Sequence, residues 1–546
     1  MHYSIFVSYN VETDVDLTFF FDNFLGVVFD TGVLLYFLWI VTRKRTKFVL
    51  ALCFTITWLW SLSSIIYSRF FFRYLTLSAI GQGEALSDNY VVRCIIHSIQ
   101  WEDLYYPVAL LLFILLLRKV KDTHKNYLKP CLKVLLGILL IDIVMHATYC
   151  AIDPQLRYLN YFVHRLYVHH IAIHRNLSQP NFAHFVRGEI RCIGAELAIK
   201  WQGKMKLNDE QFRTIKEIAA CSQISNIDNQ LKISPSRNVV FILVESYMSF
   251  TSGMKVNGRE VTPFLNSLRL DSAVYYNGRM KENVTIGESS DGQFIYMTGL
   301  LPLRSVITVS KACSSALPGL PKKLGRESRM IIPTGTAMWS QDEMCRQYAF
   351  NRLYSNIDFG GEHHSGLNDE QVFQLAMQKD KESLRPFFSV ILTMTMHQPY
   401  TKQVDSTFPI TEYSIPKDLA CYLNACHYTD RQIEHYFAYL KSSDLYDNSL
   451  IIIAADHPVH NTDFGGVSKD IPLYIVNIPY EIKEKMWSGE CNQIDVYTTL
   501  LDLLGVDSEW YGLGQSLLSP NYQSTIDSKK WDVSEWIIQG DYFSKK

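Results

Sequence analysis

Four side chains that can bind a metal ion or an anion come soon after three apolar runs in the C-terminal half of this 546-residue chain. They are Glu245 after residues 239–244, His397 after residues 387–392, and Asp456 and His457 after residues 450–455. Continuous apolar runs of this length are typical of central strands in a parallel sheet that is buried on both faces. The carboxyl ends of such strands meet at one edge of the sheet, where ligands bind. We therefore expect residues that are far apart in the sequence to converge on one site.

The expected site combines carboxylate, imidazole and hydroxyl groups. Ser289 supplies the hydroxyl, in the sequence Gly-Glu-Ser-Ser-Asp just before an apolar run that predicts a helix. Ser289 could instead serve only as the N-cap of this helix, which the short sequence alone would favour. The possible metal ligands Glu245, Asp456 and His457 make the functional role of Ser289 the preferred interpretation. A mixed oxygen and nitrogen ligand set suits Zn²⁺ or Mn²⁺, with Mg²⁺ as the alternative that all-oxygen sets favour. We expect one divalent ion, which would lower the pKa of a bound hydroxyl.

The elements that must position these side chains follow from the hydrophobic pattern. From about residue 238 onward, apolar strand patterns alternate with helical patterns. Further strands are predicted at 329–332 and 471–476, and helices at 428–441 and 496–504. This alternation predicts an α/β domain with a mostly parallel central sheet and helices on both faces.

The N-terminal third differs, because it contains segments that are apolar enough to cross a membrane. They lie at roughly residues 20–41, 48–67, 96–117 and 131–149, and each approaches the roughly 20 residues that a spanning helix needs. Two loops, at 43–47 and 118–129, carry clusters of Lys and Arg. Short basic loops stay on the cytoplasmic side, so the prediction is four crossings with the large C-terminal part outside the cytoplasm.

These patterns predict three regions. Residues 1–150 form a polytopic α-helical membrane domain, 151–236 form interfacial and linker helices, and 237–546 form the extracytoplasmic catalytic domain. The formal net charge of −2 gives no indication of nucleic-acid binding. The 11 cysteines include no Cys-x-x-Cys pair, so buried free thiols are expected, with one or two disulfides as the alternative in an extracytoplasmic domain.

Several longer stretches resemble a known family. They are NVVFILVESY, TPFLNSL, GESSDGQF, TMTMHQPY, YDNSLIIIAADH and QIDVYTTLLDLLG, and they occur in the family's order across nearly all of residues 238–518. The chain is similar to membrane-bound members of the alkaline phosphatase and sulfatase superfamily, of the lipoteichoic acid synthase and phosphoglycerol transferase type. The resemblance implies a sulfatase-like fold, in a multi-pass protein of the bacterial cell membrane with its catalytic domain outside the cytoplasm.

The resemblance also implies roles for individual residues. Glu245, Asp456 and His457 match the family's metal ligands. Ser289 matches the nucleophile, which is usually threonine in the family and which also contacts the metal. The implied reaction is metal-dependent transfer of a phospholipid head group to an envelope glycan or lipid through a phosphoserine intermediate.

Three further positions concern the substrate. His397 matches a histidine that contacts the substrate phosphate or the leaving group, and Trp339 matches an aromatic residue that lines the site. Gln341 stands where the family typically has arginine, and the histidine-glycine pair that usually precedes the tryptophan is missing. These departures fall where the head group would lie, so phosphoethanolamine is an alternative to phosphoglycerol.

Two other classes of function stay open at this point. One is a hydrolase of phosphodiesters or sulfate esters, with water as the acceptor, and the other is a membrane scaffold with a decayed site. The formylglycine mechanism of sulfatases is not expected, because Leu300 occupies the nucleophile position that the spacing of Pro302 and Arg304 would require.

Overall fold

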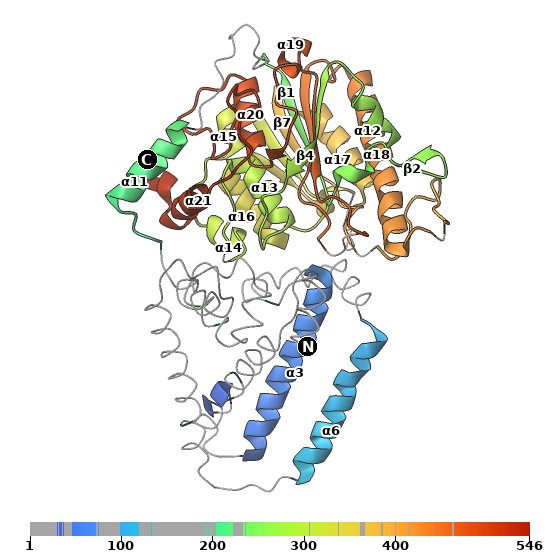
Figure 1. Cartoon of the computed structure of the whole chain (residues 1–546), viewed down its shortest axis with the longest axis vertical. Coiled ribbons are helices and arrows are strands. Elements are labelled where there is room, and N and C mark those ends of the chain that lie inside the picture. Colours follow the sequence, from blue (N-terminus) through green and yellow to red (C-terminus); the bar gives the residue numbers. More distant parts are fainter. Residues whose placement is uncertain are drawn as a thin grey trace, which may run out of the picture. The chain divides into compact units, whose positions relative to one another are not determined.

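A computed structural model (Figure 1) describes residues 46–71, 99–119, 204–221, 233–234 and 236–545, with gaps at 305, 337, 361–365, 384–385, 399, 413 and 461–463, and isolated residues before position 200. The chain divides into two compact units. The first comprises residues 1–81, 94–203 and 304–306, and the second comprises residues 82–93, 204–303 and 307–546.

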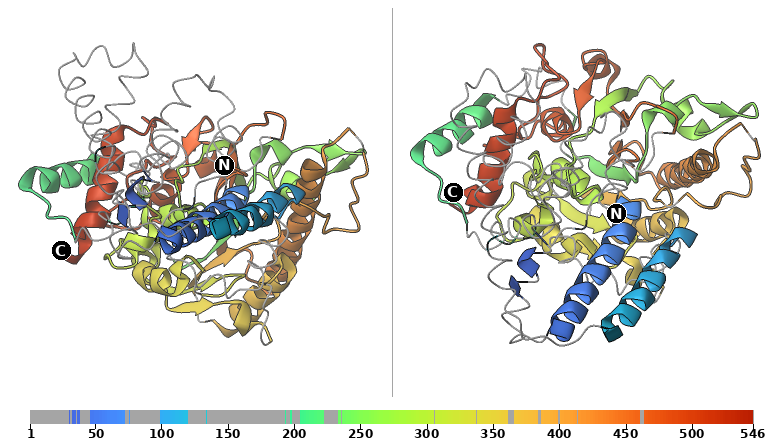
Figure 2. Two further views of the ribbon diagram at one scale, coloured as in Figure 1. Left: turned by 90° about the horizontal axis from the view of Figure 1, so that it is seen from below. Right: turned by 60° about the horizontal axis from the view of Figure 1, so that its bottom comes forward.

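In the first unit, the described structure consists mainly of two helices. α3 spans Thr46–Phe71 and α6 spans Tyr105–Lys119. They run side by side in both views of Figure 2. The indole N–H of Trp58 donates a hydrogen bond to the backbone carbonyl of Tyr106 at 3.0 Å, so a polar contact joins two otherwise apolar helices.

Among the described helices, only α3 contains a segment long and apolar enough to cross a membrane, at Lys47–Tyr67. This segment coincides with the predicted span at 48–67. α6 has 15 residues, which gives about 22 Å against a hydrocarbon core of roughly 30 Å. The predicted spans at 20–41 and 131–149 lie almost wholly outside the described residues, as does most of both basic loops.

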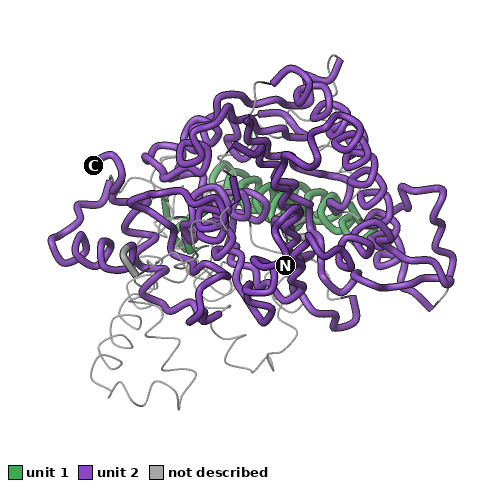
Figure 3. Tube along the Cα trace, turned by 90° about the horizontal axis from the view of Figure 1, so that it is seen from above, with its two compact units in different colours: residues 1–81, 94–203, 304–306 green, residues 82–93, 204–303, 307–546 purple. Residues whose placement is uncertain are grey.

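The second unit, purple in Figure 3, is built around an eight-stranded sheet in the order β10-β4-β9-β8-β1-β7-β5-β6. Its strands are β1 Asn238–Val244, β4 Val274–Lys281, β5 Glu327–Ile331, β6 Arg352–Tyr354, β7 Phe387–Leu392, β8 Ser449–Ala455, β9 Ile471–Val476 and β10 Cys491–Asn492. β9 runs antiparallel to both of its neighbours, and the other pairs are parallel. A two-stranded hairpin, β2 Lys255–Val256 and β3 Arg259–Glu260, lies outside this sheet. The predicted mostly parallel sheet is therefore confirmed.

The predicted strands at 239–244, 387–392, 450–455 and 471–476 are confirmed within one residue at each end. Every residue of these four strands is buried, as expected for strands covered on both faces. The strand predicted at 329–332 is also found, as β5. In the register between β1 and β8, Val244 pairs with Ala455, so the chain leaves both strands at the same level.

Helices cover both faces of this sheet, with α13 and α20 on one side and α12, α17 and α18 on the other (Figure 1). Their bounds are α12 Pro263–Leu268, α13 Ser289–Thr298, α14 Val309–Ala312, α15 Leu320–Leu324, α16 Gln341–Tyr348, α17 Asp369–Glu382, α18 Lys417–Ser442, α19 Tyr480–Lys483, α20 Asp495–Leu503 and α21 Ser528–Gly540. The helix predicted at 428–441 is confirmed as part of α18, and the helix predicted at 496–504 is confirmed as α20 within one residue at each end. α18 begins earlier than predicted, directly after Pro416, which the fixed φ of proline favours as a helix start.

A helix from before β1 completes the second unit. α11 spans Asp209–Cys221 and packs against α21. The Phe212 and Tyr542 rings lie 5.8 Å apart, and the backbone N–H of Met205 donates to the carbonyl of Gln539 at 2.8 Å. Part of the region predicted as a linker is thus folded onto the C-terminal helix.

The described cysteines are free thiols. They are Cys53, Cys313, Cys345, Cys421, Cys426 and Cys491. All except Cys313 are buried, and burial raises the pKa of thiols such as Cys345. The expectation of buried free thiols is confirmed for the part of the chain that is described.

Asp430 on α18 binds the first turn of α12. Its carboxylate oxygens accept hydrogen bonds from the backbone N–H groups of Phe264 at 2.9 Å and Leu265 at 2.8 Å. Burial, together with the charges of Glu434 and Glu260, raises the pKa of Asp430 to about 7. The folded state therefore holds this proton more tightly than the unfolded chain, in which the pKa is about 3.9.

We expect the Asp430 carboxyl to stabilise the fold increasingly as the pH falls, because its folded-state pKa is raised. The gain should develop as the pH falls through about 7 toward the unfolded pKa of about 4. The unfolding free energy of the wild type minus that of Asp430→Asn should therefore be larger at pH 5 than at pH 8. Urea unfolding of both proteins in the same detergent measures it, and equal differences at the two pH values would contradict the prediction.

Candidate active site

The carboxyl ends of β1 and β8 bring two carboxylates together. The backbone N–H of Ser246 donates to Asp456 Oδ1 at 2.9 Å, and the Ser246 hydroxyl donates to Glu245 Oε1 at 2.6 Å. The backbone N–H of His457 also donates to Asp456 Oδ1, at 2.8 Å. These bonds hold one oxygen of each carboxylate and leave Glu245 Oε2 and Asp456 Oδ2 for other partners.

The hydroxyl of Ser289 is brought to the same place by α13. Ser289 is the first residue of this helix, and Glu288 before it has a φ of 46°, which is uncommon for a residue with a side chain. Three residues further on, Gly292 lies so close to the end of β8 that an added Cβ would be 2.3 Å from the Asp456 carbonyl oxygen. Only glycine allows this approach, which sets the distance between the helix N-terminus and the strand end.

Ser289 lies within hydrogen-bond distance of two of the predicted metal ligands. Its Oγ is 3.2 Å from Glu245 Oε2 and 3.1 Å from His457 Nε2. His457 Nδ1 donates to the Pro458 carbonyl at 2.7 Å, so the proton of the neutral ring lies on Nδ1. This tautomer leaves Nε2 with a lone pair facing the site, as metal-binding histidines require.

The separations among these atoms fit a single bound ion. His457 Nε2 is 3.7 Å from Glu245 Oε1 and 3.7 Å from Asp456 Oδ2. Tetrahedral ligands with bonds of about 2.1 Å are about 3.4 Å apart, and the distances of 3.1 to 3.7 Å lie around that value. Glu245, Asp456 and His457 thus form a candidate metal-binding group, and Ser289 completes a fourfold set.

The electrostatics also favour a cation here. Burial and, to a smaller extent, the neighbouring Glu245 charge raise the pKa of Asp456 to about 7. Burial would lower the pKa of His457, but the charges of Asp456, Glu245 and Glu288 outweigh burial and raise it. A divalent ion would supply the positive charge that these groups otherwise take up as protons.

His397 lies in the loop that follows β7. The buried Asp369 at the start of α17 holds this loop, because its carboxylate accepts from the backbone N–H groups of Met394 at 2.7 Å and Thr395 at 2.9 Å. Loss of contact with water lowers the pKa of His397, and the charges of His457 and Asp456 also act on it. The structure therefore brings His397 within electrostatic range of the candidate metal ligands.

Gln341 and Trp339 lie at the start of α16. Gln341 is buried, and its Nε2 donates to Gln293 Oε1 at 2.9 Å. Gln293 stands one turn after Ser289 on α13, so Gln341 reaches the helix that carries the hydroxyl. Trp339 is half-buried and has a φ of 54°. Their roles in substrate binding stay predictions.

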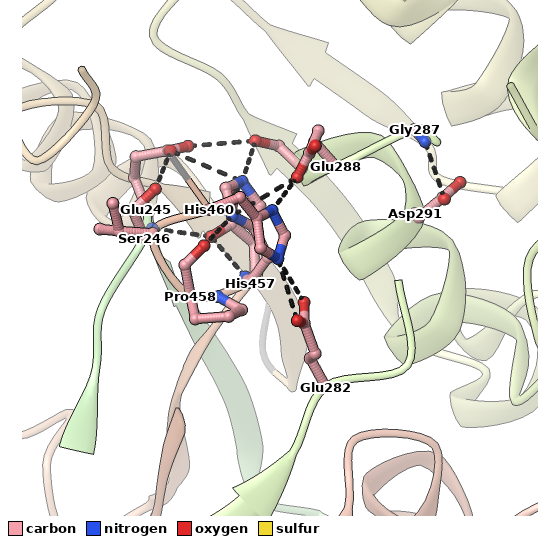
Figure 4. Close-up of polar contacts among 12 residues, drawn as sticks. Glu245, Ser246, Glu282, Gly287, Glu288, Asp291, His457, Pro458 and His460 are labelled. Carbon is pink, nitrogen blue, oxygen red and sulfur yellow. Dashed lines mark hydrogen bonds and ion pairs between the residues drawn. The ribbon is translucent and has the colours of Figure 1, made fainter. Parts of the chain in front are cut away.

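Three residues at the site were not identified from the sequence. They are Glu282, Glu288 and His460, and both glutamates contact His460 beside His457 (Figure 4). Glu288 lies within the Gly-Glu-Ser-Ser-Asp stretch, and His460 is three residues after His457. Their closeness in sequence to predicted site residues was the signal that could have identified them. Glu282 follows β4, a strand without a continuous apolar run.

A protein-family model described as Sulfatase matches residues 237–506. The chain belongs to the sulfatase and alkaline phosphatase superfamily. This superfamily member is 25% identical over 539 residues to lipoteichoic acid synthase from Staphylococcus aureus (strain USA300), with 93% of this chain and 80% of that protein covered. It is 26% identical over 374 residues to lipoteichoic acid synthase 2 from Bacillus subtilis (strain 168), with 61% and 57% covered. The match thus spans little more than half of the Bacillus relative's length.

A solved structure shows the same fold as this sulfatase-superfamily domain. The lipoteichoic acid synthase LtaP from Listeria monocytogenes aligns with a TM-score of 0.50 and 17% identity, covering 61% of this chain and 97% of that one. The fold and the distant relationship identify the chain as a sulfatase-superfamily enzyme related to lipoteichoic acid synthases.

Proposed function

We propose that this enzyme transfers the head group of a membrane phospholipid to an extracytoplasmic glycan or lipid, through a phosphoserine at Ser289. The observation that carries the proposal is the position of Ser289 Oγ, 3.2 Å from Glu245 Oε2 and 3.1 Å from His457 Nε2, at a helix N-terminus. There the hydroxyl can both bind a divalent ion and attack phosphorus. The relationship to lipoteichoic acid synthases supports phosphoglycerol as the transferred group.

The residues proposed to hold the ion are Glu245, Ser289, Asp456 and His457. Zn²⁺ or Mn²⁺ suits this mixed set of oxygen and nitrogen ligands, with Mg²⁺ as the alternative. When bound, such an ion lowers the pKa of the serine hydroxyl and offsets charge on the phosphoryl oxygens.

In the first half-reaction, Ser289 Oγ forms a bond to phosphorus, and the bond between phosphorus and the diacylglycerol oxygen breaks. The hydroxyl proton passes to Glu245 Oε2, the carboxylate oxygen 3.2 Å away. The departing diacylglycerol oxygen takes up a proton. In the second half-reaction an acceptor hydroxyl attacks phosphorus, gives up its proton, and the Ser289 oxygen leaves and regains one.

His397 is proposed to exchange these protons with the leaving and accepting oxygens. Its Nδ1 donates to the Gln398 carbonyl at 2.6 Å, which holds the ring in the loop after β7. The surrounding protein lowers the pKa of free His397, whereas a bound phosphodiester anion raises it by charge attraction. His397 is proposed to donate a proton to the departing oxygen and then to accept the proton of the incoming hydroxyl.

Phosphoethanolamine is the second candidate for the transferred head group. Gln341 is neutral, whereas phosphoglycerol transferases typically have arginine at this position. Its Oε1 is buried without a hydrogen-bond partner in the described structure, so it offers an acceptor to a donor group such as an ammonium or a hydroxyl. Trp339, close to it in sequence, would form part of the same head-group subsite.

The experiment that tests the proposed function supplies the full chain, in liposomes, with labelled phosphatidylglycerol or phosphatidylethanolamine. Diacylglycerol release from one of them, with the label transferred to an added glycan or glycolipid, is the expected result. Label released only as the free head group, across all acceptors tried, would identify a hydrolase instead. Absence of cleavage of either lipid would contradict the proposal.

The topology is a separate prediction, which the basic loops motivate. The proposed reaction requires the second unit to lie outside the cytoplasm, where the acceptor is found. A reporter that is active only outside the cytoplasm should work when fused after Lys546 and fail when inserted at 118–129. A cytoplasmic reporter serves as the reciprocal control, and its activity after Lys546 would contradict the topology and the access to acceptor together.

A further inference from the structure

Three side chains outside the proposed metal-ligand set form a continuous contact beside it. His460 Nδ1 lies 2.5 Å from Glu288 Oε2, and His460 Nε2 lies 2.9 Å from each carboxylate oxygen of Glu282. Figure 4 shows the two histidine rings with Glu288 and Glu282 around them. We call Glu282, His460 and Glu288 the glutamate–histidine clamp. It joins the segment between β4 and α13 to the loop after β8.

The contacts of His460 determine its charge. A carboxylate can only accept hydrogen bonds, so each ring nitrogen that contacts one must carry a proton. An imidazole with protons on both nitrogens is a cation. His460 therefore lies as an imidazolium between two carboxylates, and charge-assisted bonds of this kind are short and strong.

A second metal site is the other interpretation of this cluster, because ligand atoms of Glu288, His457 and His460 all lie within 4.8 Å of one another. The distances favour hydrogen bonds instead. Neighbouring ligands of one tetrahedral ion would be about 3.4 Å apart, whereas Glu288 Oε2 and His460 Nδ1 are 2.5 Å apart. In addition, His457 Nδ1 donates to the Pro458 carbonyl, so it has no lone pair for a second ion.

We propose that the glutamate–histidine clamp positions the nucleophile, with His460 and Glu282 as positioning residues for Ser289. Glu288 has an unusual backbone φ of 46° immediately before Ser289. An ion pair on its side chain holds that conformation, and so fixes where α13 starts. The inference rests on the proposed role of Ser289 as the nucleophile.

The His460 side chain also contacts His457, one of the candidate metal ligands. The His460 ring stacks on the His457 ring, with centroids 5.2 Å apart and planes 13° from parallel. Glu288 Oε2 lies 3.9 Å from His457 Nδ1. One imidazolium therefore sets the distance between the loop that ends at Ser289 and the loop that carries Asp456 and His457.

The expected effect of breaking the clamp is a loss in kcat with little change in KM. His460→Gln should lower kcat by about 10- to 100-fold, the usual range for a lost outer-shell partner. Both half-reactions should slow by the same factor, because Ser289 takes part in each. His460→Arg should recover most of the turnover, because the guanidinium is cationic and can donate to both carboxylates.

Glu282→Gln is the milder test, because it changes one atom of a side chain that is 29% exposed. It should give a smaller loss in the same direction, and combining it with His460→Gln should add nothing. The matched controls are His435→Gln and Glu434→Gln, which change the same residue types at exposed positions of α18. Neither control should alter turnover.

Two readouts besides turnover separate this proposal from others. Hydrogen exchange of the backbone amides at 285–290, measured on the full chain in detergent, should be faster in His460→Gln and return to the wild-type rate in His460→Arg. Metal content, measured by elemental analysis, should be the same in all these variants as in the wild type.

Three outcomes would overturn the clamp. Loss of one bound ion in His460→Gln would identify a second metal site, and loss of acceptor transfer with normal donor cleavage would identify a general base. Unchanged hydrogen exchange in His460→Gln would show that the clamp does not hold residues 285–290 in place. If the wild type cleaves no phospholipid, the proposed function fails, whereas hydrogen exchange still decides whether the clamp holds the Ser289 segment.

Discussion

Replacing Ser289 by alanine is expected to abolish diacylglycerol release, lowering the rate by roughly 10³-fold or more, as for other lost nucleophiles. The substitution removes the hydroxyl that lies 3.2 Å from Glu245 Oε2 and 3.1 Å from His457 Nε2. Alanine suits the first turn of a helix, so the fold should persist. The measurement is the initial rate of cleavage of labelled phospholipid by the full chain in detergent. Early quenching and peptide mass spectrometry should locate the phosphoryl group on Ser289 in the wild type.

Neighbouring substitutions provide the controls for this experiment. Ser289→Thr should retain activity, because it keeps a hydroxyl at the same position. Ser290→Ala changes the same residue type one position away, where the hydroxyl donates to the Gly287 carbonyl at 2.6 Å instead of facing the site. It should still form the phosphoserine. Complete lipid cleavage by a folded Ser289→Ala protein would refute the nucleophile assignment.

Removing the side chains of Glu245, Asp456 and His457 together is expected to eliminate the bound ion and the activity. These residues surround one point, with ligand atoms within 4.8 Å of one another. Elemental analysis of the full chain should find about one divalent ion in the wild type and none in the triple alanine variant. Added metal should stabilise the wild type by about 2.7 kcal/mol at roughly 100 times the dissociation constant. The variant should show no such gain.

The matched control removes the same three residue types at exposed positions. Glu434, His435 and Asp447 are all exposed on the second unit. Their triple alanine variant should keep the ion, the metal-dependent stabilisation and the activity. An unchanged metal content in a folded Glu245, Asp456 and His457 variant would be incompatible with the assigned site.

The central strands could be predicted because their physical requirements are local. Residues 239–244, 387–392, 450–455 and 471–476 are continuous apolar runs, and each forms a fully buried strand. By contrast, β4 at Val274–Lys281 alternates with polar residues and has partly exposed positions, so no apolar run marked it. The reversed direction of β9 could not be predicted either, because a buried strand has the same composition in both orientations.

The predicted metal ligands also show what local sequence predicts and what only tertiary contacts decide. That Glu245 and Asp456 should meet followed from their positions directly after two strands expected in one parallel sheet. Their actual proximity depends on the register, in which Val244 pairs with Ala455. The approach of Ser289 depends further on Gly292, where an added Cβ would lie 2.3 Å from the Asp456 carbonyl oxygen. Register and helix packing involve partners more than 150 residues apart, which no local pattern encodes.

The sequence by itself determined the α/β class, the main buried strands and the residue types at their ends, because burial leaves continuous apolar runs and helical periods in the chain. Only the tertiary structure decided that His460 lies between Glu282 and Glu288, and that this group stacks beside His457. These side chains come from separate loops, and loop conformation depends on non-local packing rather than on hydrophobic period. The candidate metal ligands could therefore be proposed from local pattern, while the contacts of His460 with Glu282 and Glu288 required the folded chain.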